Sequence, residues 1–70
     1  MRIVLTKHAQ KRMVERGISM ENILEVVENP DYTIRRGELT EGFKKINSRN
    51  FKIVFEVREK FIKIITVVER

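Results

Sequence analysis

The chain has 70 residues, of which 15 are Lys or Arg and 10 are Asp or Glu, giving a net charge of +5. This length makes one small domain, residues 1–70. With no cysteine and a single histidine, His8, the chain lacks disulfides, thiol chemistry and the roughly four nitrogen or sulfur ligands of a protein zinc site. We therefore expect no metal and no other cofactor, and the basic excess favours an acidic partner.

The sequence contains no recognisable membrane span or secretion signal. Its longest apolar run, residues 62–68, is far shorter than the roughly 20 residues with which a helix crosses a bilayer. The first residues, MRIVLTKH, have no apolar core and no small-residue cleavage site. We expect a cytoplasmic protein with no membrane partner.

The beginning of the chain predicts a short strand and a capped helix. Arg2–Leu5 is rich in β-branched residues, which favour a strand. Thr6 follows as an N-cap residue, because its hydroxyl can accept a hydrogen bond from the first helical turn. The helix then covers Lys7–Arg16 and ends at Gly17, the residue type that most readily takes the left-handed conformation after a helix.

A second helix follows directly and ends before the only proline. Ser19 begins it and Asn29-Pro30 ends it, because the residue before proline is driven out of the α region. The link between the helices is short, so they form a tight hairpin. On the first helix we expect Ala9 and Met13 to face the core, since they lie one turn apart, with Val14 beside them.

After the proline the hydrophobic pattern changes to a period of two, which predicts strands. Four segments have this pattern: residues 32–36, 43–48, 51–57 and 61–68. Turn residues separate them at 37–42, 47–50 and 58–60, and such short links join antiparallel neighbours. The predicted fold is α+β, with a short N-terminal strand and a two-helix hairpin packed on one face of a three- or four-stranded antiparallel meander.

Alternation assigns each strand residue to a helix-facing side or to an open side of the sheet. The helix-facing side takes the mainly apolar positions Tyr32, Ile34, Phe51, Ile53, Phe55, Val57, Ile62, Ile64, Thr66 and Val68. Phe43 and Ile46 cannot share a side without a bulge, so either Lys44 or Lys45 belongs to the open side. Taking Lys45, we expect four cations on the open side: Arg35, Lys45, Lys52 and Lys63.

These four cations are a candidate nucleic-acid-binding surface, because spaced Lys and Arg side chains can follow a phosphate backbone. An ordinary charged sheet exterior, which discourages pairing between sheet edges, explains the same pattern. The four phenylalanines and the one tyrosine add little to the nucleic-acid interpretation, since most of them are needed for the core.

The first helix carries the candidate catalytic residues His8, Arg12 and Arg16, which are spaced one turn apart. In metal-independent RNA cleavage an imidazole takes the proton of the 2′-hydroxyl, and a guanidinium stabilises the charge on the phosphorane. The alternative is a histidine that only packs and arginines that only meet solvent, with Arg12 and Glu15 forming an i, i+3 ion pair.

The segment HAQKRMVERGISMENILEVVENP resembles the opening of a widespread prokaryotic family of small domains of unknown function, which begin with H-A-x-x-R-x-x-E-R-G-I-S and continue to Asn-Pro. The matching residues are His8, Ala9, Arg12, Glu15, Arg16, Gly17, Ile18, Ser19, Asn29 and Pro30. The second half of the chain matches only in its layout of alternating strands. A looser likeness to BrnT toxins lies in the helix, the Gly-hydrophobic-Ser turn and the second helix.

Both groups resemble the RelE/ParE toxin superfamily, which has the same order of strand, two helices and antiparallel strands. The resemblance implies a toxin of the toxin–antitoxin type, either an endoribonuclease that cleaves mRNA or a protein that arrests growth in another way. RNA or the ribosome would be its target, and an acidic or disordered antitoxin protein would hold it inactive. The chain departs from RelE ribonucleases, because no C-terminal helix follows Glu69-Arg70, and their site residues do not transfer. The alternative is a non-enzymatic binding module of the same fold that grips a protein or nucleic-acid partner.

Overall fold

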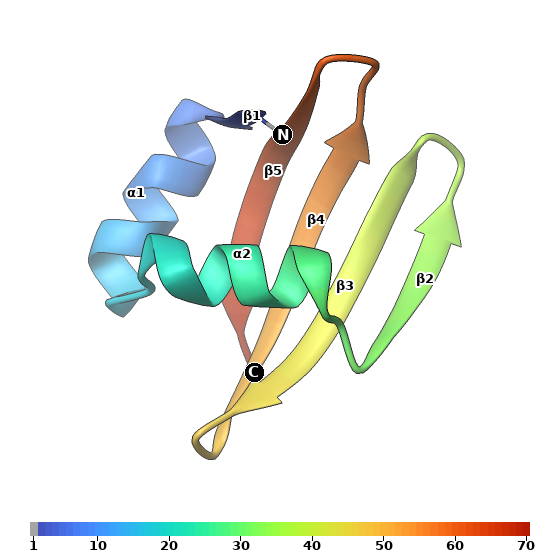
Figure 1. Ribbon diagram of the computed structural model, residues 1–70. Coiled ribbons are helices and arrows are strands. Elements are labelled where there is room, and N and C mark those ends of the chain that lie inside the picture. Colours follow the sequence, from blue (N-terminus) through green and yellow to red (C-terminus); the bar gives the residue numbers. More distant parts are fainter. Residues whose placement is uncertain (1) are drawn as a thin grey trace.

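The structure is a computed structural model that describes residues 2–70. Figure 1 shows a twisted sheet with one helix in front of it and one beside it. In chain order the elements are β1 (Arg2–Leu5), α1 (Lys7–Arg16), α2 (Met20–Glu28), β2 (Tyr32–Arg36), β3 (Leu39–Ile46), β4 (Arg49–Val57) and β5 (Phe61–Glu69).

The sheet is mixed, because its first and last strands are parallel neighbours. Its strand order is β1-β5-β4-β3-β2, and β2 to β5 form the expected antiparallel meander. The α+β class is confirmed, whereas the prediction of a sheet of three or four antiparallel strands is wrong. A fifth strand, β1, pairs in parallel with β5 and sets Ile3 beside Ile62 and Leu5 beside Ile64. This pairing joins the two ends of the chain, so no local pattern indicates it.

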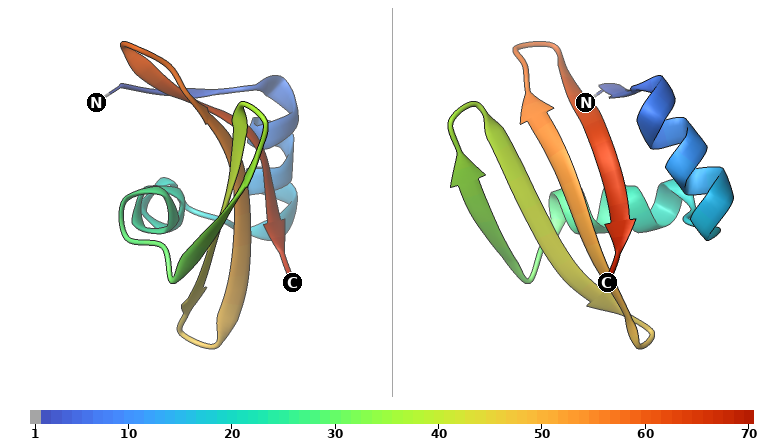
Figure 2. Two further views of the ribbon diagram at one scale, coloured as in Figure 1. Left: turned by 90° about the vertical axis from the view of Figure 1, so that its right-hand side faces the viewer. Right: turned by 180° about the vertical axis from the view of Figure 1, so that it is seen from behind.

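The two helices do not lie side by side on one face of the sheet, as the predicted arrangement had them. α2 crosses the sheet over β3 and β4, whereas α1 runs beside β5 at the edge of the sheet, beyond the end of β1 (Figures 1 and 2). The backbone N–H of Thr6 donates to the Ile64 carbonyl at 3.1 Å, and this bond holds the start of α1 at that edge. The face opposite α2 carries no helix over β2 to β5, as the right-hand view of Figure 2 shows.

Local capping explains the bounds of both helices, and the predicted ends are confirmed. Thr6 caps α1 by accepting from the Ala9 N–H at 3.0 Å, and Gly17 ends it with a left-handed φ of 61°. Ser19 and Asn22 form a reciprocal capping box at the start of α2, with bonds of 3.0 and 3.1 Å. The hairpin therefore turns within Gly17, Ile18 and Ser19, and Ile18 is buried in the core.

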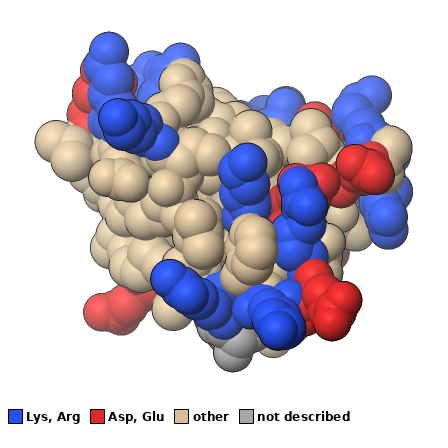
Figure 3. Space-filling model, turned by 90° about the horizontal axis from the view of Figure 1, so that it is seen from above, with Lys and Arg blue, Asp and Glu red and all other residues tan. Residues whose placement is uncertain are grey.

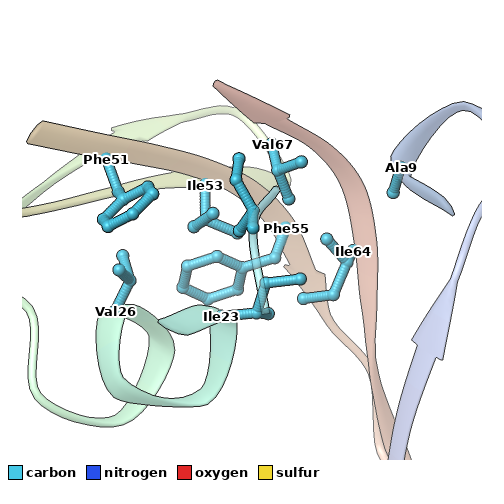
Figure 4. Close-up of a cluster of buried hydrophobic side chains, with 9 residues drawn as sticks. Ala9, Ile23, Val26, Phe51, Ile53, Phe55, Ile64 and Val67 are labelled. Atoms are coloured by element: carbon cyan, nitrogen blue, oxygen red, sulfur yellow. The ribbon is translucent and has the colours of Figure 1, made fainter. Parts of the chain in front are cut away.

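The core lies between α2, the sheet and the inner side of α1 (Figure 4). Its buried apolar residues are Ala9, Ile18, Ile23, Val26, Phe51, Ile53, Phe55, Ile64 and Val67. Ala9 and Met13 face the core as expected, but Val14 is 84% exposed and the prediction for it is wrong. Because α1 packs against a sheet edge, only a narrow stripe of the helix is covered, and Val14 lies outside it.

A bulge changes the side-chain pattern of β5. Phe55 pairs with Ile64 and Val54 pairs with Thr66, so Ile65 is an extra residue between the two pairs. After the bulge Val67, which pairs with Ile53, is buried on the helix side, whereas Thr66 and Val68 turn to the opposite side. The assignment of Thr66 and Val68 to the helix side is therefore wrong.

The edge strand β2 also has the opposite orientation from the expected one. Thr33 pairs with Gly42, which pairs with Ile53, so these three positions share the helix side. Tyr32 and Ile34 consequently point to the face without helices, and the prediction that they point inward is wrong. Val57 of β4 lies on the helix side, as predicted, but it is 57% exposed because β4 extends beyond α2 at this end (Figure 1).

The turn predicted for residues 37–42 is only two residues long. Gly37 and Glu38 make it, with a left-handed φ of 62° at Gly37, and β3 starts at Leu39. Gly42 lies in β3 under α2, where an added Cβ would come within 3.2 Å of the Phe55 ring and 3.4 Å of the Val26 carbonyl oxygen. This glycine therefore permits close packing of a helix on a strand instead of marking a turn.

Candidate nucleic-acid interface

We call the sheet face opposite α2 the open face. The pairing register of β2 to β5 places five cations on it: Arg36, Lys45, Lys52, Lys63 and Arg70. Two carboxylates share it, those of Glu41 and Glu56. Apolar side chains of Ile34, Phe43, Val54 and Val68 lie between these charges. The open face is thus a basic surface with an apolar floor.

The register also decides between the two lysines of β3. Lys45 pairs with Asn50 and points to the open face, on the same side as Phe43 and Lys52. Lys44 pairs with Phe51 and points to the helix side, where its ammonium donates to the Asn29 carbonyl at 2.7 Å. This bond satisfies a carbonyl group at the end of α2. The Glu25 carboxylate of the same helix lies 3.5 Å from the Lys44 ammonium.

Three of the four predicted binding residues, Lys45, Lys52 and Lys63, share the open face, and the expected orientation of Arg35 is wrong. Arg35 pairs with Thr40, which pairs with Phe55 on the helix side. Its Nε donates to the Gly37 carbonyl at 3.0 Å and so stabilises the β2–β3 turn. Arg36, the next residue, is the cation that β2 contributes to the open face.

Glu41 partly neutralises the centre of the open face. Its carboxylate lies 3.2 Å from Arg36 and 3.5 Å from Lys52, and its side chain is only 12% exposed. Burial of the carboxyl group alone would raise the pKa of Glu41. The hydrogen bond from Arg36 and the charge of Lys52 act in the opposite direction and together outweigh it, so the pKa of Glu41 is lowered. Glu41 therefore stays ionised, and Arg36 and Lys52 are less available to an anion than Lys45 and Lys63.

Lys45 and Lys63 make no ion pair within residues 2–70. Lys63 lies opposite Glu56 in the register, but the Glu56 carboxylate bonds to Arg58 at 3.1 Å. Seen from above, the basic side chains stand in several separate groups, some with acidic side chains beside them (Figure 3). The upper end of the molecule therefore carries separate cations and no single basic patch.

An aromatic stack at one end of the open face is the feature that the sequence interpretation missed. The rings of Tyr32 and Phe43 are parallel within 7°, with centroids 4.6 Å apart, and the Arg70 guanidinium lies 5.5 Å from the Phe43 centroid. The alternation of apolar residues predicted that Tyr32 belongs to the core, and it indicated no binding role for Arg70 or Asn50. The missing signal was the register of β2 on β3, which sets Tyr32 opposite Phe43.

The candidate catalytic residues all lie on α1, away from this stack (Figure 1). His8, Arg16 and Glu15 are exposed and Arg12 is half-buried. Within residues 2–70 none of these four side chains makes a hydrogen bond or an ion pair, so the Arg12–Glu15 pair of the alternative, structural interpretation is not formed. Nothing in this part of the chain orients the His8 imidazole.

Residues 2–70 contain no group of three or more His, Cys, Asp or Glu side chains arranged to hold a metal ion. None of their helices is long and apolar enough to cross a membrane.

Comparison with known families places the chain in one of them. The model of the family described as "Domain of unknown function (DUF4258)" matches residues 5–69, and the chain belongs to this family. The expectation of a small family of unknown function is thereby confirmed. No curated protein and no solved structure gives a significant match to the chain.

Proposed function

We propose that this protein is an RNA-binding module of the RelE/ParE toxin type, and that it binds RNA through the open face. The observation that carries the proposal is the uncovered sheet face with five cations, two carboxylates and an aromatic stack. Cations near an exposed π-face are the combination that proteins use for single-stranded nucleic acids, because the charges follow the phosphates and the rings stack with bases.

The relation to the RelE/ParE superfamily rests on the order of the elements. The order of strand, two helices and antiparallel strands supports it. The parallel pairing of β1 with β5 is a separate feature, which the element order alone does not specify. In this proposal an acidic antitoxin protein competes with RNA for the cations of the open face. The two ligands would share the chemistry of a polyanion.

RNA cleavage by α1 is the second candidate function, and one observation favours it. His8 is exposed in the first turn of α1, with Arg12 one turn further along, so an RNA phosphate has access to both. In this mechanism His8 takes the 2′-hydroxyl proton and Arg12 stabilises the phosphorane. Arg16 stands about 12 Å along the helix axis from His8, given a rise of about 1.5 Å per residue, and would bind a neighbouring phosphate.

The test of RNA binding is the salt dependence of affinity for a labelled single-stranded oligouridylate. Each phosphate neutralised on a single strand lowers the slope of log K against log salt by about 0.7. We therefore expect the double variant Lys45→Gln/Lys63→Gln to reduce the magnitude of the slope by about 1.4. The matched control is Lys7→Gln/Lys11→Gln, which removes two exposed charges from α1 and should leave the slope unchanged. If only the control variant reduces the magnitude of the slope, RNA binds to α1 and the proposed binding through the open face is wrong.

The test of RNA cleavage uses His8→Ala, because His8 is exposed and we expect its replacement to leave the fold intact. Cleavage by α1 requires that the wild type degrades RNA and arrests growth on induction in a bacterial host, and that His8→Ala does neither. If both proteins leave RNA and growth unaffected, the cleavage candidate is refuted. RNA binding through the open face would remain, because it is measured without catalysis.

A further inference from the structure

A cavity of about 340 Å³ lies at the end of the open face, beside the aromatic stack. It extends from the start of β2 to the end of β5, and its lining includes Asp31, Tyr32, Phe43, Lys45, Asn50 and Arg70. This volume is in the range of small-ligand sites, about 300–1,000 Å³, and suits one nucleotide. Tyr32, Phe43 and Arg70 thus belong both to the aromatic stack and to the lining of the cavity.

Three polar groups of this cavity are free to bind a ligand. Within residues 2–70, no side-chain hydrogen bond or ion pair is made by the Lys45 ammonium, the Asn50 amide or the Arg70 guanidinium. The Arg70 backbone N–H donates to the Asn50 carbonyl at 2.7 Å, which fixes the end of β5 against β4. Two of these three groups are cations, so the cavity favours an anion.

The side-chain carboxylate of Asp31, which lines the cavity, is already engaged. Oδ2 of Asp31 accepts from the Lys45 backbone N–H at 2.9 Å, and Oδ1 lies 3.7 Å from the Lys44 ammonium. Lys44 thus offsets the charge of Asp31 from the helix side of the sheet. The repulsion that Asp31 would exert on a phosphate is correspondingly reduced.

The outer face of the Tyr32 ring is open for stacking. Phe43 covers one face of the ring, and β2 is the last strand of the sheet, so no strand lies beyond the other face. Tyr32 is 54% exposed although its ring is held parallel to its neighbour. Phe43, by contrast, is only 7% exposed, since Tyr32 and Arg70 flank it. The stack thus ends in one accessible aromatic face.

We propose that this end of the open face is a nucleotide subsite, in which an unpaired base of RNA stacks on Tyr32 while its sugar–phosphate chain runs through the cavity past Lys45 to Asn50 and Arg70. The subsite rests on the proposed function, since it adds base stacking to a surface that binds RNA by charge. It requires a single strand, because a paired base within a duplex has no free face for Tyr32. It accepts any base, because every base has a π-face.

The chain itself carries the probe for this proposal. Tyr32 is the only tyrosine and there is no tryptophan, so the intrinsic tyrosine fluorescence reports on this one ring. Titration with oligouridylate should quench it, after correction for absorbance by the bases. Inorganic polyphosphate, which has charge without bases, should bind at low salt and leave the fluorescence unchanged. Equal quenching by polyphosphate would overturn the subsite.

Variants separate stacking from charge. Tyr32→Leu should weaken the binding of labelled oligouridylate about tenfold, which corresponds to the loss of about 1.4 kcal/mol of base stacking, and leave both polyphosphate binding and the salt slope unchanged. Tyr32→Phe should retain the affinity. Val14→Ala, which shortens an exposed apolar side chain of α1 outside the open face, is the control and should not change it.

The two proposals fail in different ways. If wild-type protein binds neither oligouridylate nor polyphosphate, the proposed RNA binding is refuted and the subsite with it. If oligouridylate binds and Lys45→Gln/Lys63→Gln reduces the salt slope, but Tyr32→Leu binds like the wild type, only the subsite is refuted. Loss of affinity in Tyr32→Leu together with a retained salt slope supports both.

Discussion

Arg49, at the start of β4, and Glu69, at the end of β5, form a bidentate ion pair next to the end of α1. Nε of Arg49 donates to one carboxylate oxygen of Glu69 at 3.1 Å, and Nη2 donates to the other at 2.8 Å. The same guanidinium donates to the carbonyls of Arg16 at 3.1 Å and Gly17 at 3.5 Å, and it lies 4.9 Å from the Phe51 centroid. One side chain therefore joins β4, β5 and the last carbonyls of α1.

Arg49→Lys should lower the melting temperature, because an ammonium cannot reproduce the planar fork that bonds two oxygens and two carbonyls. The amide N–H groups of Gly17 and Ile18, which bond to the Met13 carbonyl, should exchange faster with solvent in this variant. Arg58→Lys, which alters an exposed pair with Glu56, is the control. Equal effects of the two variants on melting and exchange would contradict the role given to Arg49.

Glu69 should make stability depend on acid. The hydrogen bond from Arg49 lowers the pKa of Glu69 despite desolvation, with help from the charges of Arg49 and Arg16. Between the lowered folded value and the ordinary value of about 4.3, the unfolded chain binds more protons, so stability falls as pH drops through this window. Glu69→Gln should lose part of the fall in melting temperature between about pH 5 and pH 3. Glu28→Gln, on the exposed side of α2, is the charge-matched control.

Thr6 joins the start of α1 to the bulge of β5. Its hydroxyl accepts from the Ala9 N–H at 3.0 Å and donates to the Ile65 carbonyl at 2.9 Å. Thr6→Val keeps the shape and removes both bonds, and we expect it to lower the free energy of unfolding by about 1–2 kcal/mol in urea denaturation. Thr6→Ser should stay close to the wild type. A large loss in Thr6→Ser would show that the methyl group, not the hydroxyl, holds this junction.

Gly42 should tolerate no larger residue, since α2 approaches β3 closely there. The added carbons of Gly42→Val would meet the Phe55 ring and Val26, and overpacking of this kind costs about 1–3 kcal/mol. Thr33→Val, opposite Gly42 on the exposed edge strand, should change the free energy of unfolding by less than about 0.5 kcal/mol. Urea denaturation of both variants checks the comparison, and a neutral Gly42→Val would contradict the packing.

Residues whose roles are local could be predicted from the sequence. The caps made by Thr6, Gly17 and Ser19 and the break at Pro30 act within a few residues of their own positions, and the bounds of both helices follow from them. The strands β1 and β2 also have the predicted bounds, because each lies between clear breaks in the pattern. The α+β class follows from the same signals.

Features that depend on pairing between distant segments could not be predicted in this way. The bulge at Ile65 reverses the alternation of β5, and residues 64–68 around it are all β-branched, a side-chain type that fits either side of a sheet. Tyr32 is apolar enough for the core, yet α2 does not extend over β2, so its ring is used on the other face. The aromatic stack of the candidate site therefore became visible only with the sheet register.

Methyl resonances measured during RNA titration test the location of the binding surface most directly. Val54 and Val68 lie on the open face, and Val14 is an exposed methyl probe on α1. With oligouridylate we predict shifts for Val54 and Val68 and none for Val14. Shifts confined to Val14, or no shift at any of the three at RNA concentrations that saturate a charge-matched polyanion, would contradict RNA binding through the open face.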